Sequence, residues 1–124
     1  MKILPITVKA NLPERLKPLQ EMANNIWFCW KSEAIRMFQQ LNSELWEEVD
    51  HNPKKLVGML DQARIDEILS DEGILDQMDR LYRDYQRYAQ DKTQYTYNLE
   101  RPADYTIAYL SCEYGLTECL PVYS

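Results

Sequence analysis

Two carboxylates near the carboxyl end of the chain are the residues best placed to do chemistry. Glu113 and Glu118 follow directly on residues 106–110, a compact apolar run with the length of a buried strand, and Gly115 lies between them. Ligands of open α/β sheets bind beyond the carboxyl ends of strands, so side chains at such a point can reach a substrate or a neighbouring loop. A turn at the surface explains the same residues equally well. The residues alone leave both interpretations open.

The other reactive residue types lack partners at a useful spacing. His51, the one histidine, stands immediately before a helix cap, which favours a structural or solvent-facing role. The three glycines lie too far apart to cradle a phosphate, and nothing marks a lysine as a Schiff-base former. No cofactor site is therefore predicted in this chain. A tryptophan face suits a sugar ring, but tryptophans at helical spacing usually belong to the core, which is the prediction for Trp27, Trp30 and Trp46.

The cysteine pattern excludes a zinc site. The three cysteines are Cys29, Cys112 and Cys119. An odd number without an export signal predicts reduced thiols in the cytoplasm. They contain no closely spaced Cys-x-x-Cys pair that would join with His51 to bind zinc, so no metal site is predicted. The apolar stretch at the N-terminus is broken by Pro5 and lacks a cleavage site, and no segment is predicted to span a membrane.

Composition indicates one globular unit with an acidic surface. A chain of 124 residues with 45% hydrophobic and 27% charged residues is long enough to bury a core. Its formal net charge is −6. Nucleic acid and anionic membranes are therefore not expected as partners.

Hydrophobic periodicity predicts a mainly helical chain. Residues 6–10 alternate as in a half-buried strand, and a regular helix is predicted to begin near Lys17. Apolar residues then recur at helical spacing, namely Leu16, Leu19, Ala23, Ile26 and Trp30. The residues predicted to cap the helices that follow are Ser32, Asn42 or Ser43, Asn52 and Asp61.

The strongest periodic signal begins after Asp71. Its apolar stripe consists of Ile74, Met78, Leu81, Tyr85 and Tyr88. On the other face Asp76 precedes Arg80 by one helical turn and Asp79 precedes Arg83 in the same way, a spacing that favours ion pairs. The fold class predicted from these patterns is mainly α, with a short strand near each end.

The carboxyl-terminal residues resemble a known family. Residues 107–124 are similar to the start of the first sheet in bacterial α-glucan (glycogen or maltodextrin) phosphorylases, where a strand leads into Ser-x-Glu-Phe/Tyr-Gly. The family pattern Glu-x-x-Pro-x-x-Ser, which precedes a Gly-Gly-Leu-Gly loop, is matched by Glu118, Leu120, Pro121 and Ser124. The upstream matches to the helical extension of these enzymes are Leu12-Pro13, residues 25–30, Leu45-Trp46 and His51-Asn52-Pro53. The departures, Phe28 and Cys29, are compatible with a core.

This resemblance implies a division into a helical N-terminal domain at 1–104 and the start of a Rossmann-like glycosyltransferase domain at 105–124. It implies that the whole enzyme cleaves α-1,4-glucan with inorganic phosphate, releases glucose 1-phosphate and uses pyridoxal phosphate. The glycine loop and the cofactor lysine would follow residue 124. Glu113 and Glu118 would lie beside that loop, while the 124-residue chain alone would be structural, inactive and partnered by the remainder of the catalytic domain.

Two alternatives stay open. Glycogen and starch synthases also begin with a strand, a Glu-x-x-Pro element and a Gly-Gly-Leu loop, but they lack the long helical preface. A free-standing interaction module would instead use the stripe from Ile74 to Tyr88 as a docking face. The apolar strand at 106–110 would be an unpaired edge in the isolated chain, which predicts self-association.

Overall fold

The computed structural model describes residues 11–91 and Thr117. Within them the chain forms six α-helices, two short 3₁₀ helices and no strand. The 3₁₀ helices are η1 (Glu14–Leu16) and η2 (Ile26–Trp30). The α-helices are α1 (Lys17–Ala23), α2 (Ser32–Leu41), α3 (Ser43–Glu48), α4 (Pro53–Met59), α5 (Gln62–Ser70) and α6 (Glu72–Gln90). The predicted mainly α fold is confirmed for this part of the chain.

Four α-helices begin with a side-chain cap, because a short polar residue at that position accepts a bond from an otherwise unpaired amide of the first turn. The capping oxygen lies between 2.7 and 3.1 Å from the amide nitrogen in each case. The caps and the residues whose amides they accept are Asn42 and Leu45, Asn52 and Lys55, Asp61 and Arg64, and Asp71 and Ile74. These caps confirm the predicted starts of α3, α4, α5 and α6.

The predicted cap at Ser32 is wrong. Ser32 is the first residue of α2, and the capping position is Lys31, whose backbone is extended (φ −120°, ψ 100°) and whose side chain makes no capping bond. Serine therefore lies one residue too far along the chain to accept from the first turn.

The single helical stripe predicted from Leu16 to Trp30 is also wrong. The helix ends at Ala23, and the Asn25 side chain accepts a bond from the Trp27 amide at 2.9 Å to begin η2. A 3₁₀ helix has three residues per turn, so the register of an α-helix is lost after this break. Trp27 consequently turns inward and is 2% exposed, whereas Trp30 is 58% exposed.

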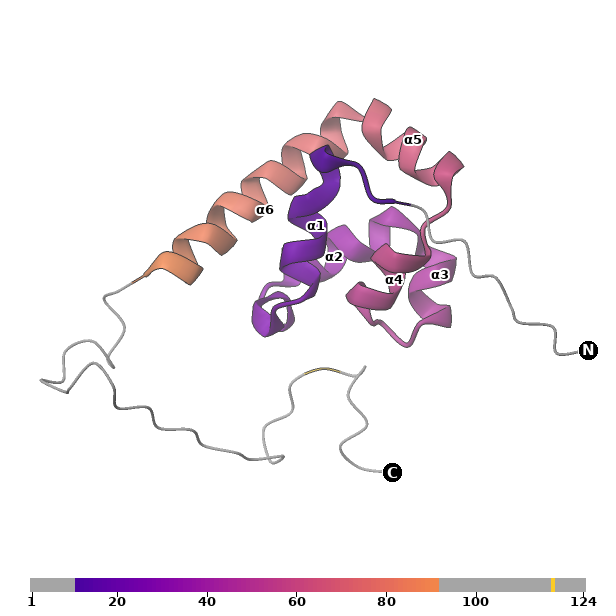
Figure 1. The fold of residues 1–124 in the computed structure, drawn as a ribbon. Coiled ribbons are helices and arrows are strands. Elements are labelled where there is room, and N and C mark those ends of the chain that lie inside the picture. Colours follow the sequence, from indigo (N-terminus) through magenta and orange to yellow (C-terminus); the bar gives the residue numbers. More distant parts are fainter. Residues whose placement is uncertain (1–10, 92–116, 118–124) are drawn as a thin grey trace, which may run out of the picture.

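α1 lies at the centre of the helical unit and contacts α6 on one side and α4 on the other (Figure 1). The core beneath it contains an aromatic cluster. The Phe38 ring of α2 packs edge-on against Phe28, with ring centres 6.0 Å apart, and stacks on Trp46 of α3 at 6.4 Å. All three side chains are buried, which ties η2, α2 and α3 into one hydrophobic cluster.

Arg64 connects α5 to the end of α2. Its Nε donates to the Leu41 carbonyl at 2.5 Å, and its Nη2 donates to the Gln40 carbonyl at 3.2 Å. Both carbonyls belong to the last turn of α2, where no amide of the helix is available to donate to them. A cation at this end also complements the helix dipole. The contact fixes the start of α5 against the end of α2.

The stripe of α6 is used internally. Met78 and Leu81 are buried, Ile74 and Tyr85 pack against the core, and Tyr88 at the far end is 38% exposed. A helix whose apolar face is covered by its own chain has little left to offer a partner, which counts against the interaction-module alternative. The two predicted strands and the domain boundary at residue 104 lie outside the described residues and stay predictions.

Candidate functional site

The predicted site residues are not among those the structure describes. Glu113 and Glu118 lie outside the described ranges, as do Cys112 and Cys119. Thr117 is described and half-buried. The predicted role of the two glutamates beside a glycine loop therefore stays a prediction.

His51 has the contacts of a structural residue. Its ring stacks on buried Trp46, with ring centres 5.3 Å apart, and its Nε2 lies 3.1 Å from a carboxylate oxygen of Glu47. Asp50 and His51 both have positive φ angles, 53° and 58°, which turn the chain between α3 and α4. The imidazole covers the edge of the aromatic core at this turn.

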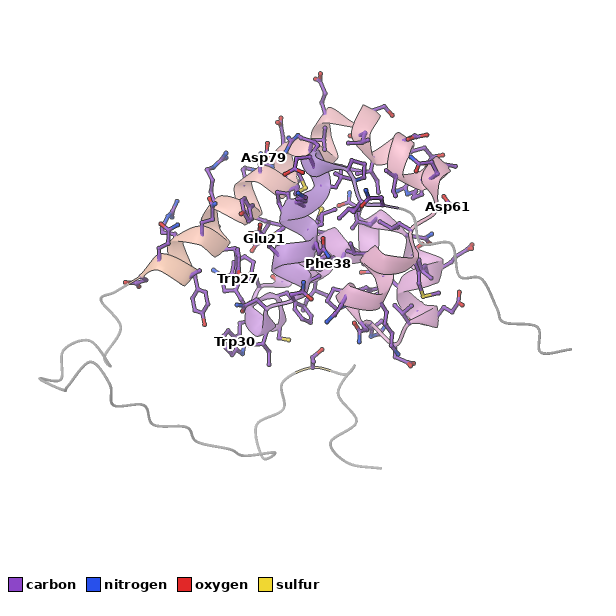
Figure 2. All side chains as sticks on the ribbon, viewed as in Figure 1. Glu21, Trp27, Trp30, Phe38, Asp61 and Asp79 are labelled. Atoms are coloured by element: carbon purple, nitrogen blue, oxygen red, sulfur yellow. The ribbon has the colours of Figure 1, made fainter. Side chains whose placement is uncertain are left out.

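Two polar clamps hold α6 against the first helices (Figure 2). Arg15 donates two hydrogen bonds to Asp79, each 2.7 Å long, and the Tyr82 hydroxyl donates to Glu21 at 2.6 Å. The bond from Arg15 lowers the pKa of Asp79, and the bond to the Glu21 carboxylate raises the pKa of Tyr82. Both pairs join two helices, so the pKa shifts indicate a structural role for these residues.

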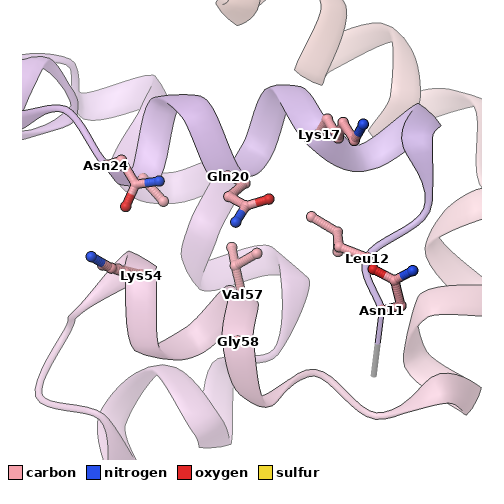
Figure 3. Close-up of a pocket in the computed structure, with 9 residues that line it drawn as sticks. Asn11, Leu12, Lys17, Gln20, Asn24, Lys54, Val57 and Gly58 are labelled. Carbon is pink, nitrogen blue, oxygen red and sulfur yellow. The ribbon is translucent and has the colours of Figure 1, made fainter. Parts of the chain in front are cut away.

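A hollow of about 470 Å³ lies between α1 and α4 (Figure 3). Gln20 of α1 faces Val57 of α4 across its middle, with Lys17 and Lys54 toward its two ends. The remaining described lining residues are Asn11, Leu12, Ala23, Asn24 and Gly58. Among these residues there are ammonium and amide groups but no carboxylate or imidazole. These described residues offer groups that bind but no acid–base pair suited to proton transfer. Lys17 is in addition paired with Glu14.

A second, more open hollow of about 390 Å³ lies where the end of α6 meets η2. Its lining residues are Trp27, Lys31, Asp84, Arg87, Tyr88 and Asp91. Beside it the exposed Trp30 ring packs edge-on against Tyr88, with ring centres 6.4 Å apart and planes at 68°. Trp30 and Tyr88, together named the aromatic platform, were not predicted as a site. The available signal was Asn24-Asn25, because two asparagines in a row favour a helix break and a new cap, and the break reverses the exposure of Trp30.

The described residues, 11–91 and Thr117, contain neither a metal cluster nor a membrane-spanning helix. No group of three or more metal-ligating side chains lies close enough there to hold an ion. No helix in the same residues is long and apolar enough to cross a bilayer. α6, the longest helix, is amphipathic and carries charge along its outer face.

Known proteins resemble this chain over nearly its whole length. Glycogen phosphorylase of Mycobacterium tuberculosis (strain CDC 1551 / Oshkosh) is 33% identical over 133 residues, which cover 95% of this chain. Maltodextrin phosphorylase of Thermococcus litoralis is 28% identical and covers 94% of the chain, and glycogen phosphorylase of Aquifex aeolicus is 29% identical and covers 86%. The chain spans 14% of the length of each of these relatives. No solved structure matches the chain.

The predicted resemblance to α-glucan phosphorylases is confirmed by these relatives. A family model described as a protein of unknown function, DUF3417, matches residues 12–120. That range includes every helix of the described unit. The chain therefore belongs to the DUF3417 family and is similar, over nearly all its residues, to one part of glycogen and maltodextrin phosphorylases.

Proposed function

We propose that the chain is the N-terminal part of an α-glucan phosphorylase, an enzyme that releases glucose 1-phosphate from α-1,4-glucan with inorganic phosphate in the cytoplasm. The observation that carries the proposal is the match of 95% of the chain to a protein named glycogen phosphorylase. A maltodextrin phosphorylase supports the same reaction class. The names of these two relatives favour a phosphorylase, whose second substrate is phosphate, over the synthase alternative, whose donor is a sugar nucleotide.

Within that enzyme the helical unit has a structural role, and the chain alone is inactive. Its buried side chains are hydrophobic throughout the described part. The Arg15–Asp79 and Tyr82–Glu21 clamps connect its own helices, and among the described lining residues neither hollow has a nucleophile beside a base. The reacting groups and the lysine that carries pyridoxal phosphate belong to the remainder of the catalytic domain. This cofactor supplies a phosphate group that relays a proton.

Glu113 and Glu118 are the residues of this chain proposed to support the reaction most closely. By resemblance they lie beside the glycine loop, whose amides would hold the substrate phosphate. A carboxylate there can position the loop by hydrogen bonds or reach a glucose hydroxyl. Both roles use the carboxylate as a hydrogen-bond acceptor.

The test uses the complete gene product with maltoheptaose. Phosphate-dependent formation of glucose 1-phosphate is expected, whereas glucan elongation from a sugar nucleotide would favour a synthase. Glu118→Gln should lower the turnover by about 10²-fold, because a displaced loop would lose an amide donor that stabilises transition-state charge. Its thermal midpoint should stay close to that of the wild type. Equal turnover at matched thermal midpoints would contradict the role of Glu118.

A further inference from the structure

An exposed tryptophan is the feature of this fold that its packing does not explain. Within the described residues the large hydrophobic side chains that are exposed are Trp30 at 58%, Met59 at 53% and Tyr88 at 38%. The rings of Trp30 and Tyr88 contact each other edge-on across η2 and α6. Apolar surface left in water is unfavourable, so two neighbouring exposed rings mark a surface that another group covers.

The aromatic platform is held in place by the core. Trp27, in the same 3₁₀ helix as Trp30, is buried and packs edge-on against Tyr85 of α6, with ring centres 5.5 Å apart. The Lys31 ammonium lies 5.8 Å from the centre of the Trp27 ring. These contacts tie η2 to α6, so the platform is preformed and a group that covers it has little ordering cost to overcome on this side.

The chain leaves the helical unit at the edge of the platform. α6 ends at Gln90, and Asp91 lines the hollow together with Tyr88. An extended chain spans at most about 3.6 Å per residue, so a residue four positions beyond Asp91 lies within about 14 Å of it. The entropic cost of closing a loop grows with its length. The residues that directly follow α6 are therefore the part of the chain that can cover the platform at the smallest entropic cost.

Residues 93–99 have a composition that suits the platform. Their sequence is Thr-Gln-Tyr-Thr-Tyr-Asn-Leu, which contains two aromatic residues and no charge. Two carboxylates, Asp84 and Asp91, and two cations, Lys31 and Arg87, line the adjoining hollow. Such a balanced set of charges selects neither an acidic nor a basic segment. The hydroxyl and amide groups of a neutral segment can donate to the carboxylates and accept from the cations.

The spacing of the two tyrosines matches the spacing of the platform rings. Side chains of an extended segment alternate between two sides, so Tyr95 and Tyr97 share one side and lie about 6.6 Å apart. The ring centres of Trp30 and Tyr88 are 6.4 Å apart. Each tyrosine can therefore contact one platform ring, while Thr96 points to the opposite side.

We propose that residues 93–99 pack across the aromatic platform, with Tyr95 and Tyr97 against its two rings. These residues lie outside the described ranges. The contact would fix the direction in which the chain continues from α6 toward the predicted strand at 106–110. It uses only residues of this chain, so it does not rest on the proposed function.

A second copy of the chain is a poorer fit to the platform. Two aromatic side chains flanked by four charged ones form a small apolar area, whereas a stable interface buries about 800 Å² on each partner. The charged side chains would also have to lose water without a defined partner. A segment of the same chain needs less area, because its covalent connection gives it a high effective concentration at the platform.

The test is acrylamide quenching of the Trp30 fluorescence in the 124-residue chain. The signal of Trp30 is the difference between each chain and the same chain carrying Trp30→Phe, since the other two tryptophans are buried. The double variant Tyr95→Ala and Tyr97→Ala should make Trp30 more accessible to acrylamide. Thr96→Ala is the matched control, because it changes the side chain between the two tyrosines that points away from the platform, and it should leave the quenching unchanged.

Urea unfolding gives a second, independent readout. Trp30→Ala should lower the folding equilibrium constant by about fivefold more in the wild type than in the chain carrying Tyr95→Ala and Tyr97→Ala, the effect of one aromatic contact. Far-UV circular dichroism establishes that each variant is folded before the comparison. If Trp30→Ala does not fold, the quenching measurement, which keeps an aromatic ring at position 30, still decides.

Three outcomes overturn the inference. Equal accessibility of Trp30 with and without the two tyrosines refutes the packing of residues 93–99. A loss of stability for Trp30→Ala that does not depend on the tyrosines refutes it as well. Accessibility that falls as the protein concentration rises would place a second copy on the platform, which also contradicts the proposal.

Discussion

Trp27 and Trp30 provide a matched pair for testing how the chain folds around η2. The two residues are of the same type, three positions apart and in the same 3₁₀ helix. Trp27 is 2% exposed and contacts Tyr85, whereas Trp30 is 58% exposed. Alanine at position 27 should therefore destabilise the protein far more than alanine at position 30.

The expected magnitudes follow from burial. A buried tryptophan removes about 150–250 Å² from water, which at about 25 cal/mol per Å² corresponds to ~4–6 kcal/mol before the compactness of the unfolded chain is considered. Measured losses for Trp→Ala in cores are about 3–5 kcal/mol, and this is the expectation for Trp27→Ala. Trp30 keeps more than half of its surface in water, so Trp30→Ala should cost only about 1 kcal/mol, mainly from the Tyr88 contact.

Urea unfolding followed by far-UV circular dichroism measures the two free energies of unfolding in a chain carrying Tyr95→Ala and Tyr97→Ala, which excludes the proposed contact of these tyrosines with Trp30. Trp27→Phe serves as a control that keeps an aromatic ring in the pocket, and its loss should lie between those of the two alanine variants. Similar losses for Trp27→Ala and Trp30→Ala would show that both rings are buried. The break at Asn24-Asn25 would then be incorrect, and the aromatic platform would lose its basis.

Two further predictions concern α6. Asp71→Ala should lower the free energy of unfolding by about 1 kcal/mol, because the Ile74 amide loses its cap, whereas Ser70→Ala, one residue earlier, should cost less; equal losses would exclude a capping role. The pKa of Asp79 is lowered by Arg15, so the stabilisation from this pair is present above the unfolded pKa of an aspartate, about 4, and is lost as the pH falls through the lower folded value. Asp79→Asn should reduce the thermal midpoint slightly at pH 7, since the pair is partly exposed, and should make the midpoint less sensitive to acid; an unchanged acid dependence would contradict this assignment.

Local rules explain why the helix starts could be predicted. Asn52-Pro53 combines a capping side chain with a proline at the first helical position, where its missing amide costs nothing. Asp61 and Asp71 each precede an apolar periodic segment by one turn. Such signals involve residues within three or four positions of each other, so the chain around them is sufficient to decide the outcome.

Contacts between distant residues could not be predicted in this way. Local spacing assigns Asp79 to Arg83, and Arg83 does act on this carboxylate through its charge. The two short hydrogen bonds come instead from Arg15, which lies 64 positions away and whose planar guanidinium matches both carboxylate oxygens. Only the packing of α6 beside the first helices brings that partner within reach.

The candidate site residues also differ in whether local sequence could reveal them. Resemblance to a family points to Glu113 and Glu118, because the motif around them is short and specific, and their roles stay predictions. The aromatic platform depends on the change from α-helical to 3₁₀ geometry after Ala23, which moves Trp30 out of the apolar stripe. A periodicity computed for one helix type cannot contain that change, so the sequence predicted a core residue where the structure has an exposed one.

The natural reading frame beyond the codon for Ser124 tests the central claim most directly, because it reveals whether this helical unit precedes a phosphorylase domain. The account predicts a Gly-Gly-Leu-Gly loop immediately afterwards, followed by a long two-domain chain with a lysine for pyridoxal phosphate. A stop codon at that position would contradict the account and would leave a free-standing helical protein.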